Sequence, residues 1–343
     1  MVAPLHVGVV GVGRMGAFHV QTLRTLEGIS TITLTDADRA RADRVARKLR
    51  AAVVETPEAL VEAGVDALVI TTATAGHAPL LRLAAAAGLP AFCEKPVALE
   101  LATIDDVIAH AERAGILVQI GFQRRFDVGY GAAHDAVATG ALGKLLVVRA
   151  ATHDPAPPAE DYVAGSGGIF RDLLIHDFDA LRYVTGGRIV EVCADAAVRE
   201  SPWFERYDDV DAAVATLRFS DGVLGILSGT RHDPLGYDVR LEVFGTADSI
   251  AVGVDARSPL RSVEPGAMHP AGAGYQNFLE RFGPAYRAEI AAFVDAVRAG
   301  TDSPCGLDDA RAALLVALAA ERSRRERRPV AIEEVASAQA VRS

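Results

Sequence analysis

The stretch LHVGVVGVGRMGAFHVQTL, Leu5 to Leu23, decides the fold of the first part of this chain. It begins with a short apolar, β-branched run, Leu5 to Val10, which is typical of a strand buried on both faces. Three glycines follow directly, at positions 11, 13 and 16, and a helical pattern begins near Met15. Glycines at this spacing, in a turn between a strand and a helix, predict a loop that binds a dinucleotide.

Each residue of this turn has a physical reason to be there. Gly11 permits the tight turn, Gly13 lets a pyrophosphate approach the backbone, and Gly16 lets the helix pack closely against the strand. Arg14 and Met15 begin the helix, where backbone N–H groups and the positive end of the helix dipole attract phosphate. We therefore expect these five residues to contact a cofactor.

The next apolar run favours one nicotinamide cofactor over the other. It extends from Ile29 to Thr35 and ends in Asp36, about 20 residues beyond the last glycine. An acidic side chain at this point accepts hydrogen bonds from the adenosine ribose, which favours NAD. Arg39 and Arg41 lie close by and could accommodate a 2′-phosphate, so NADP stays open as the less favoured cofactor.

Strand and helix patterns continue to alternate as far as residue 121. Strand-like runs at 67–72, 91–94 and 117–120 are separated by helical patterns at 79–87 and 104–114. This alternation predicts a doubly wound parallel sheet of the Rossmann type, which binds ligands at the carboxyl ends of its strands. The residues expected at that edge are Thr72, Ala73, His77, Glu94 and Lys95. Lys95 would lie near the nicotinamide, although its position alone also fits an ordinary surface lysine.

The pattern changes after residue 121, so we predict a Rossmann domain over 1–121 and a second, α+β domain over 122–343. The second domain has several consecutive strand patterns without intervening helices, which predicts a large open antiparallel or mixed sheet. Helices are expected at 284–298 and 308–325, packing back towards the first domain, and a frayed tail at 331–343. A Gly/Pro/Ala-rich loop is expected at 259–274. The predicted strands are 142–152, 188–198, 213–219, 222–230, 238–245 and 249–254.

Composition excludes several classes of partner. The formal net charge is −10, which opposes binding to nucleic acid or to an anionic membrane surface. The three cysteines, Cys93, Cys193 and Cys305, form no closely spaced pair, which fits a reducing compartment. No apolar run approaches the roughly 18 residues that cross a bilayer, and no signal-peptide pattern is present. We expect a cytoplasmic protein that binds a small molecule.

One stretch of the second domain, GGIFRDLLIHDFDALRYVTGG, Gly167 to Gly187, is unusual for a helix. At about 100° per residue, one face of the helix is apolar, and Asp172, His176, Asp179 and Tyr183 form a stripe opposite to it. Solvated helix faces favour Lys and Glu, whereas Asp is a poor residue within a helix. The stripe therefore indicates a functional surface. The predicted core residues are Phe170, Leu174, Phe178 and Leu181.

Two chemistries could use this stripe. Asp172 and His176 are four residues apart and could chelate a metal, but the sequence supplies no further cluster of ligands, so we expect no metal. The other chemistry is the oxidation of an alcohol, which needs an acceptor for hydride and a base for the hydroxyl proton. Histidine is suited to be that base because it titrates near neutral pH.

Together these motifs resemble the Gfo/Idh/MocA oxidoreductase family, over nearly the whole chain. The combination of GFQRRFD, His153-Asp154-Pro155 and GGIFRDLLIHDFD resembles the inositol 2-dehydrogenase branch of that family. The segments that carry the resemblance are the glycine loop, Asp36, Glu94-Lys95-Pro96, residues 121–127, 167–172, 175–179, 236–238, 242–245 and 278–282.

The resemblance implies a catalytic group of Lys95, Asp172 and His176. His176 would be the general base, Lys95 would polarise the reacting oxygen, and Asp172 would orient the substrate. It also implies NAD as cofactor, a polyol or cyclitol as substrate, and a homo-oligomer, tetramer or dimer, with the large sheet at the subunit interface. The further candidates for substrate hydroxyls are His153, Asp179, Tyr237 and, less favoured, Tyr286.

Other functions stay open at this point. The substrate could be an aldose such as glucose or an open-chain sugar acid, and NAD could be retained through a hydrolytic or epimerising cycle. The chain could also be a non-catalytic regulator that binds nucleotide or sugar. Arg124 and Arg125 are expected to be structural. The segment Arg231 to Leu235 departs from the run usual in the branch, which leaves the substrate less certain than the chemistry.

Overall fold

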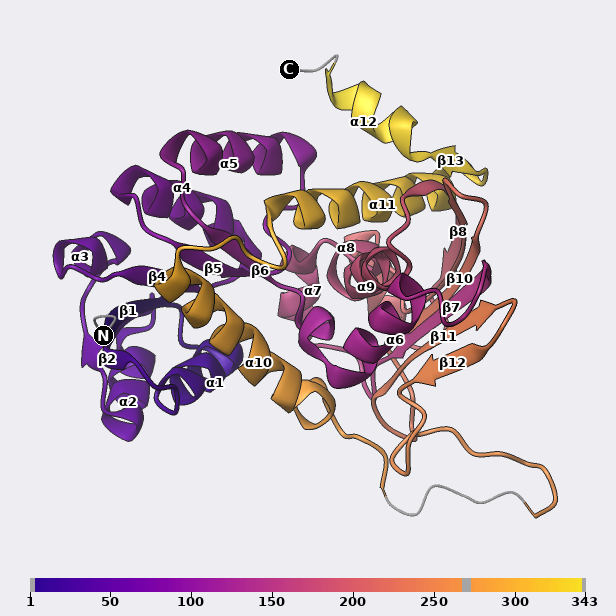
Figure 1. Ribbon diagram of the computed structural model, residues 1–343, viewed down its shortest axis with the longest axis horizontal. Helices are drawn as coiled ribbons and strands as arrows, with labels where there is room; N and C mark the ends of the chain where they lie inside the picture. Colours follow the sequence, from indigo (N-terminus) through magenta and orange to yellow (C-terminus); the bar gives the residue numbers. More distant parts are fainter. Residues whose placement is uncertain (1–3, 267–272, 341–343) are drawn as a thin grey trace. The chain divides into compact units, whose positions relative to one another are not determined.

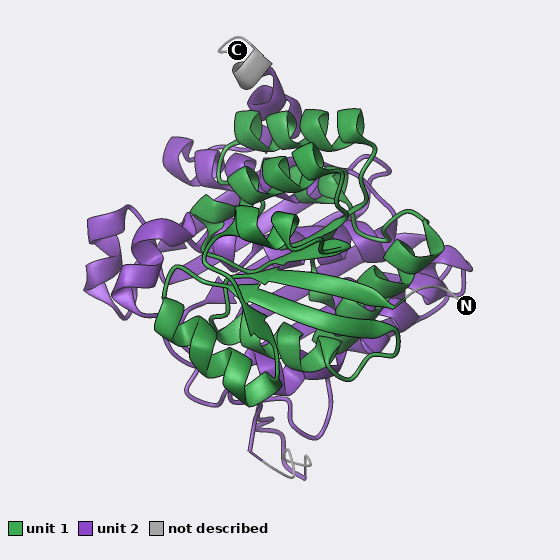
Figure 2. Cartoon of the chain, turned by 90° about the vertical axis from the view of Figure 1, so that its left-hand side faces the viewer, with its two compact units in different colours: residues 1–123, 286–311 green, residues 124–285, 312–343 purple. Residues whose placement is uncertain are grey.

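The computed structural model describes residues 4–266 and 273–340, and it divides into two compact units, coloured separately in Figure 2. Unit 1 combines the chain up to residue 123 with residues 286–311, and unit 2 combines 124–285 with the chain from residue 312 onward. The chain thus leaves unit 1 after residue 123, returns to it for residues 286–311, and then rejoins unit 2. A single boundary after residue 121 does not describe this return.

Unit 1 contains a parallel sheet of six strands in the order β3-β2-β1-β4-β5-β6 (Figure 1). The order reverses at β1, as in a doubly wound sheet, which confirms the predicted fold class. Strand β3 is short and pairs with β2 through two residues only. The strands are β1 Leu5–Val10, β2 Ile29–Thr35, β3 Ala52–Val53, β4 Ala67–Ile70, β5 Ala91–Glu94 and β6 Val118–Gly121.

Helices cover both faces of this sheet. Helices α1 and α2 pack on one face with the later part of α10, where Ile290, Phe293 and Val294 join the core formed by β1, β2 and β4. Helices α4 and α5 pack against each other beside β4 and β5. The helices are α1 Arg14–Leu23, α2 Arg39–Leu49, α3 Pro57–Glu62, α4 His77–Ala87, α5 Leu101–Ala114 and α10 Phe278–Ala299.

Unit 2 contains a mixed sheet of seven strands in the order β12-β11-β7-β10-β9-β8-β13. All neighbours are antiparallel except β7 and β10, which are parallel and end together at His153 and Thr230. The predicted open sheet is therefore confirmed as mixed. The strands are β7 Leu145–His153, β8 Ile189–Ala197, β9 Ala212–Phe219, β10 Leu224–Thr230, β11 Asp238–Gly245, β12 Ser249–Val252 and β13 Val330–Ala331.

The stretch predicted as one helix is divided into α8, Ile169–Asp172, and α9, Ile175–Thr185. The N–H of Leu174 donates to the carbonyl of Ile169, five residues back, at 2.9 Å. This wide turn adds a residue to the helical repeat and changes its phase. The predicted core side chains are all buried, but a single helical wheel does not hold across the turn. Unit 2 also contains α6 Val128–Ala138, α7 Glu160–Ser166 and most of α11 Leu307–Glu326.

The prediction of a frayed tail is wrong for residues 331–340, and residues 341–343 lie outside the described residues. Strand β13 pairs with β8, and α12, Ile332–Ala340, follows it directly. Glu334 accepts a hydrogen bond from the N–H of Ala331 at 3.0 Å and pairs with Arg328 at 2.7 Å, which fixes the start of this helix. Part of the predicted loop at 259–274 lies outside the described residues. Among the described helices, none is both long and apolar enough to cross a membrane.

Candidate active site

The glycine loop of unit 1 has the geometry that a dinucleotide needs. Gly11 has a φ of +85°, and a Cβ at this position would lie 2.9 Å from the backbone of Thr72. A Cβ on Gly16 would overlap the carbonyl of Gly11 and lie 2.6 Å from Thr71 Oγ1. A Cβ on Gly13, in contrast, would have no described atom within 4 Å. Gly11 and Gly16 are therefore required by packing, whereas Gly13 leaves room for a ligand beside the backbone.

The helix that follows the loop is suited to hold phosphate. Helix α1 begins at Arg14 with Gly13 as its N-cap, no described side chain caps its amino terminus, and its first turn has no acidic residue. Uncapped backbone N–H groups and the helix dipole favour an anion here. Gly13 and the first turn of α1, including Met15, thus fit the pyrophosphate of a dinucleotide.

Asp36 follows β2 and fixes the loop through its carboxylate. Its Oδ2 accepts the N–H of Val12 at 2.7 Å, and its Oδ1 accepts the N–H of Asp38 at 2.8 Å. An ionised carboxylate offers about four acceptor positions, so two remain for ribose hydroxyls. Arg41 Nη1 lies 3.5 Å from the same carboxylate, so a cation is also close to this edge.

His77 connects the ends of two strands. Its Nδ1 lies 2.8 Å from the carbonyl oxygen of Pro96, and its Nε2 lies 3.0 Å from that of Thr72. Burial lowers the pKa of His77 although both carbonyls oppose this effect, and a neutral ring donates only one of these hydrogen bonds. His77 is buried and therefore positions the Thr72–Ala73 turn and the segment after Lys95.

A buried polar cluster lies behind Lys95, and the sequence did not predict it. Nε2 of His19 lies 2.9 Å from Oε1 of Glu94, the residue before Lys95. Glu289 of α10 is fully buried, and neither of its carboxylate oxygens has a hydrogen-bond partner among the described residues. Burial, followed by the charge of Glu94, raises the pKa of Glu289 well above its usual value. The signal available in the sequence was that Glu289 lies between apolar residues of its helix.

Unit 2 holds Asp172 and His176 on neighbouring helices. Asp172 ends α8 and is buried, and His176 lies in the first turn of α9 and is half-buried. Oδ1 of Asp172 accepts a hydrogen bond from the hydroxyl of Tyr162 at 2.8 Å, and Oδ2 accepts one from Nη2 of Arg231 at 2.8 Å. Tyr162 was not predicted to belong to the site, and Arg231 was not predicted to pair with Asp172.

Asp177 and Asp179 each pair with an arginine. Arg124 Nη1 donates to Asp177 at 2.6 Å, and Arg125 donates to both oxygens of Asp179 at 2.9 and 2.6 Å. Asp179 is 0% exposed. Because of the wide turn at Leu174, Asp179 does not continue the stripe that was predicted with Asp172 and His176. Both carboxylate oxygens of Asp179 thus accept hydrogen bonds from Arg125, and its role as a substrate contact stays a prediction.

The other predicted substrate residues fall in different units. His153 ends β7, with Nε2 at 3.3 Å from Ser228 Oγ and Nδ1 at 3.6 Å from Asp238 Oδ2. Tyr237 directly precedes β11 and is 6% exposed; burial raises its pKa. Tyr286 belongs to unit 1, where it packs edge-on against Phe18. His153 and Tyr237 thus belong to the unit that contains His176, and Tyr286 does not.

Two groups of side chains have the spacing of metal ligands. One is His19, Glu94 and Glu289, and the other is His153, Asp233 and Asp238. In the second group Arg240 Nε donates to Asp238 at 2.8 Å, which places a fixed cation where an ion would lie.

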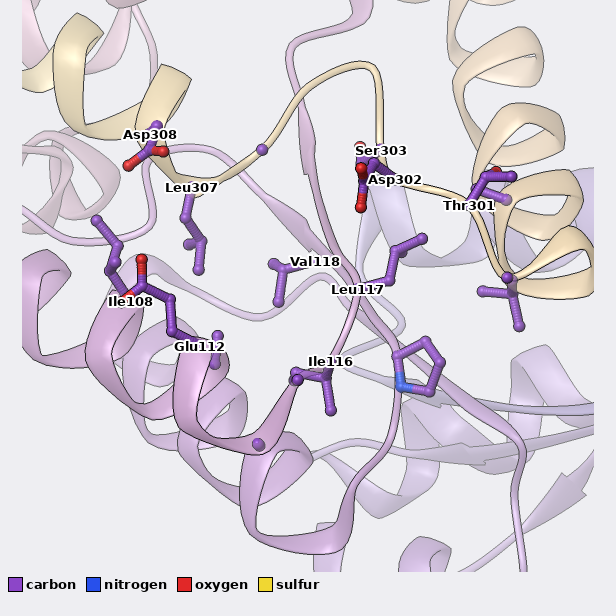
Figure 3. A pocket seen from close by; sticks show the side chains of 18 of the residues that line it. Ile108, Glu112, Ile116, Leu117, Val118, Thr301, Asp302, Ser303, Leu307 and Asp308 are labelled. Atoms are coloured by element: carbon purple, nitrogen blue, oxygen red, sulfur yellow. The ribbon is translucent and has the colours of Figure 1, made fainter.

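A cavity in unit 1 lies away from the glycine loop of the same unit. The cavity has a volume of about 770 Å³. It is lined by side chains of α5, the start of β6 and the segment around Thr301 to Asp308 (Figure 3). Leu117 and Val118 mark the amino end of β6, whereas the glycine loop follows the carboxyl end of β1 in the same parallel sheet. The cavity therefore lies at the opposite edge from the one that binds ligands in such sheets.

Comparison with known proteins matches both parts of the chain. Residues 5–122 match the description "Oxidoreductase family, NAD-binding Rossmann fold", and residues 130–251 match "GFO/IDH/MocA C-terminal domain". The myo-inositol 2-dehydrogenase of Thermotoga maritima is 36% identical over 335 residues, covering 96% of this chain and 99% of that protein. The scyllo-inositol 2-dehydrogenase (NAD(+)) of Bacillus subtilis is 34% identical over 332 residues, covering 95% of each.

A solved structure agrees with the fold. The scyllo-inositol dehydrogenase of Lactobacillus casei, crystallised with NAD(H) and scyllo-inositol, superposes with a TM-score of 0.87 at 28% identity. The match covers 96% of this chain and 99% of that chain.

Proposed function

The chain belongs to the Gfo/Idh/MocA oxidoreductase family, and from this premise we propose that it oxidises a secondary ring hydroxyl of myo-inositol or a related cyclitol to the ketone, with NAD as cofactor. The observation that carries the proposal is the position of Lys95 directly after β5, at the same carboxyl edge of the sheet as the glycine loop. Similarity to dehydrogenases of myo- and scyllo-inositol over more than nine-tenths of both chains supports the substrate class.

The cofactor residues proposed in unit 1 are supported by the fit of the loop. Gly13 and the start of α1 would hold the pyrophosphate, and Asp36 would accept hydrogen bonds from the adenosine ribose. A 2′-phosphate beside the Asp36 carboxylate would meet like charge, which favours NAD. Arg41 would offset part of that repulsion, so the proposed preference is a ratio of affinities and does not exclude NADP.

The proposed chemistry separates two transfers. NAD, when bound, supplies the acceptor for the hydride that leaves carbon. His176 takes the hydroxyl proton, and the Lys95 ammonium donates a hydrogen bond to the oxygen as negative charge develops on it. Asp172 accepts a hydrogen bond and orients the reacting groups. In the reverse direction His176 returns the proton.

A polyol is the substrate class that these side chains suit. His153 and Tyr237 present ring nitrogens and a hydroxyl that can bond to further ring hydroxyls. Tyr286 is a weaker candidate because it packs within unit 1. An apolar alcohol would leave such groups unpaired, at a cost of about 1–3 kcal/mol each.

The outer face of the unit 2 sheet supports a homo-oligomer, a tetramer or a dimer. Val214 of β9 is 55% exposed, and Leu224 and Ile226 of β10 are 46% and 47% exposed. Exposed and buried residues alternate along these two paired strands. Exposed apolar side chains gathered on one sheet face are typical of a contact between subunits.

One experiment tests the proposed function. The protein is incubated with NAD, and separately with NADP, and with a panel of inositols, aldoses and sugar acids, while absorbance of the reduced cofactor is followed. Faster turnover of a cyclitol than of any aldose supports the proposal. Turnover of aldoses alone would reassign the substrate, as the departing segment Arg231–Leu235 allows. Binding of NAD and cyclitol without turnover would identify a non-catalytic regulator.

A further inference from the structure

The carboxylate of Asp172 is fixed from two sides within unit 2. Tyr162 of α7 donates to Oδ1 at 2.8 Å, and Arg231 donates to Oδ2 at 2.8 Å. Asp172 and Arg231 are 5% and 3% exposed, so this ion pair is screened little by water. The two donors determine the plane of the carboxylate and leave it little rotational freedom.

Arg231 is itself held by a second carboxylate. Its Nη1 lies 3.2 Å from Oδ2 of Asp154, so one guanidinium bridges two acids. Its backbone N–H donates to the carbonyl of Asp211 at 2.7 Å, and the N–H of Asp154 donates to the carbonyl of Thr230 at 2.9 Å. Asp154 follows β7 and Arg231 follows β10, and these strands are paired in parallel up to His153 and Thr230. The guanidinium is thus anchored by the sheet rather than by a loose loop.

The charges explain what Arg231 does for Asp172. Burial alone would lower the pKa of Arg231, but the carboxylates of Asp172 and Asp154 raise it above its usual value. Burial raises the pKa of Asp209, a third acid that interacts with both Arg231 and Asp172. Without the guanidinium, the buried carboxylate of Asp172 would lose the cation that lies 2.8 Å from it, and a buried charge without its cation is costly.

The half-exposed ring of Tyr162 completes this arrangement. Its hydroxyl points to Asp172 although the residue is 51% exposed, and burial of the hydroxyl, followed by the Asp172 charge, raises its pKa. Tyr162 therefore stays neutral and donates its proton to the hydrogen bond.

We infer that Arg231, with Asp154 as its anchor and Tyr162 as the second donor, is a positioning residue that holds the carboxylate of Asp172 in the orientation that the reaction needs. The inference rests on the proposed function, in which Asp172 orients the reacting groups. It assigns a role to Arg231, the first residue of the segment Arg231–Leu235. Arg231 acts through Asp172 and is not proposed to touch substrate.

Steady-state kinetics with NAD and the best cyclitol tests the inference, using Arg231→Met, Arg231→Lys and Tyr162→Phe. We expect Arg231→Met to lower kcat on the order of 100-fold while KM for NAD changes less than about threefold, because misplacement of a reacting group acts mainly on kcat. Arg231→Lys keeps the positive charge but not the planar guanidinium, so its kcat should be higher than that of Arg231→Met and lower than that of wild type. Tyr162→Phe should lower kcat in the same way but less.

The matched control is Arg281→Met. Arg281 pairs with Asp127 at 2.9 Å in the same unit, and both side chains are similarly little exposed, at 11% and 12%. Its loss should reduce stability without changing kcat. Arg231→Met with kcat within about threefold of wild type, or with a loss no larger than that of Arg281→Met, would overturn the inference. Should Arg231→Met fail to fold, the same comparison with Arg231→Lys and Tyr162→Phe decides the question.

A double-mutant cycle measured by unfolding distinguishes failure of this inference from failure of the proposed function. Urea unfolding of Arg231→Met, Asp172→Asn and the double variant needs no substrate. If Arg231 holds Asp172, the double variant unfolds near the midpoint of the worse single variant; additive shifts would overturn the inference. Absence of turnover by wild type with every cyclitol and aldose would refute the proposed function, and this cycle would then decide alone whether Arg231 holds Asp172.

Discussion

Replacement of Glu289 by glutamine should stabilise the protein at neutral pH. Glu289 is fully buried on α10, and both its carboxylate oxygens lack a hydrogen-bond partner among the described residues. Glu94 lies close enough to raise its pKa further, after burial, and His19 pairs with Glu94 at 2.9 Å. The folded protein therefore holds a proton on Glu289 that the unfolded chain releases.

The magnitude follows from proton linkage. A glutamate in an unfolded chain has a pKa of about 4.3, and the folded pKa of Glu289 is raised above that value. The folded state then binds more protons than the unfolded state between the two values, so this group's contribution to stability is fully present below the unfolded pKa. It is lost as pH rises towards the folded pKa, at about 1.4 kcal/mol per pH unit. Glutamine does not titrate. The free energy of unfolding of Glu289→Gln should therefore exceed that of wild type by an amount that grows by about 1.4 kcal/mol per pH unit.

Urea unfolding from about pH 4.5 to about pH 8, spanning the range above the unfolded value, measures this difference. Wild type and Glu289→Gln should have similar midpoints at the acidic end and diverge as pH rises, with the variant more stable. Glu112→Gln is the matched control, because Glu112 is exposed on α5 of the same unit. Its curve should run parallel to that of wild type. A Glu289→Gln curve that also runs parallel would refute a proton held on Glu289.

Four further outcomes are expected. Lys95→Ala and His176→Ala should each lower kcat by about two orders of magnitude or more, with NAD binding still measurable by fluorescence titration; near-normal turnover in either would remove it from the catalytic group. Asp36→Ala should weaken NAD more than NADP in the same titration, and an unchanged ratio would exclude the ribose contact. Gly16→Ala should lower the thermal midpoint because its Cβ overlaps the Gly11 carbonyl, whereas Gly13→Ala should leave the midpoint near wild type and weaken NAD. Activity should survive EDTA; a loss that zinc restores would contradict the metal-free mechanism.

The nucleotide unit could be predicted because its signals are local. Gly11, Gly13 and Gly16 lie within six residues, and the structure gives each the environment that its place in the motif requires. The buried face of Phe170, Leu174, Phe178 and Leu181 was also predicted, since apolar spacing survives a small change of helical phase. Such features depend on residues that are neighbours in sequence.

The partners of Asp172 could not be predicted in the same way. Tyr162 lies on a separate helix, and Arg231 lies 59 residues after Asp172 in the chain. Leu174 forms the wide turn that changes the helical phase. Glu289 reaches the cluster behind Lys95 only because the chain returns to unit 1. Each of these features depends on tertiary contacts, which the spacing of residues in one segment does not encode.

The acidic character of the stretch from Gly167 to Gly187 has a different meaning once its partners are known. Asp172, Asp177 and Asp179 are paired with Arg231, Arg124 and Arg125 respectively. Each of the three carboxylates of this stretch therefore has a guanidinium partner, and the stretch is not an anionic surface that would attract a cation. Histidine is the side-chain type that exchanges protons near neutral pH. The pairing thus leaves His176 as the side chain of this stretch that is suited to carry the proton of an alcohol, with Asp172, four residues before it in sequence, as a fixed acceptor.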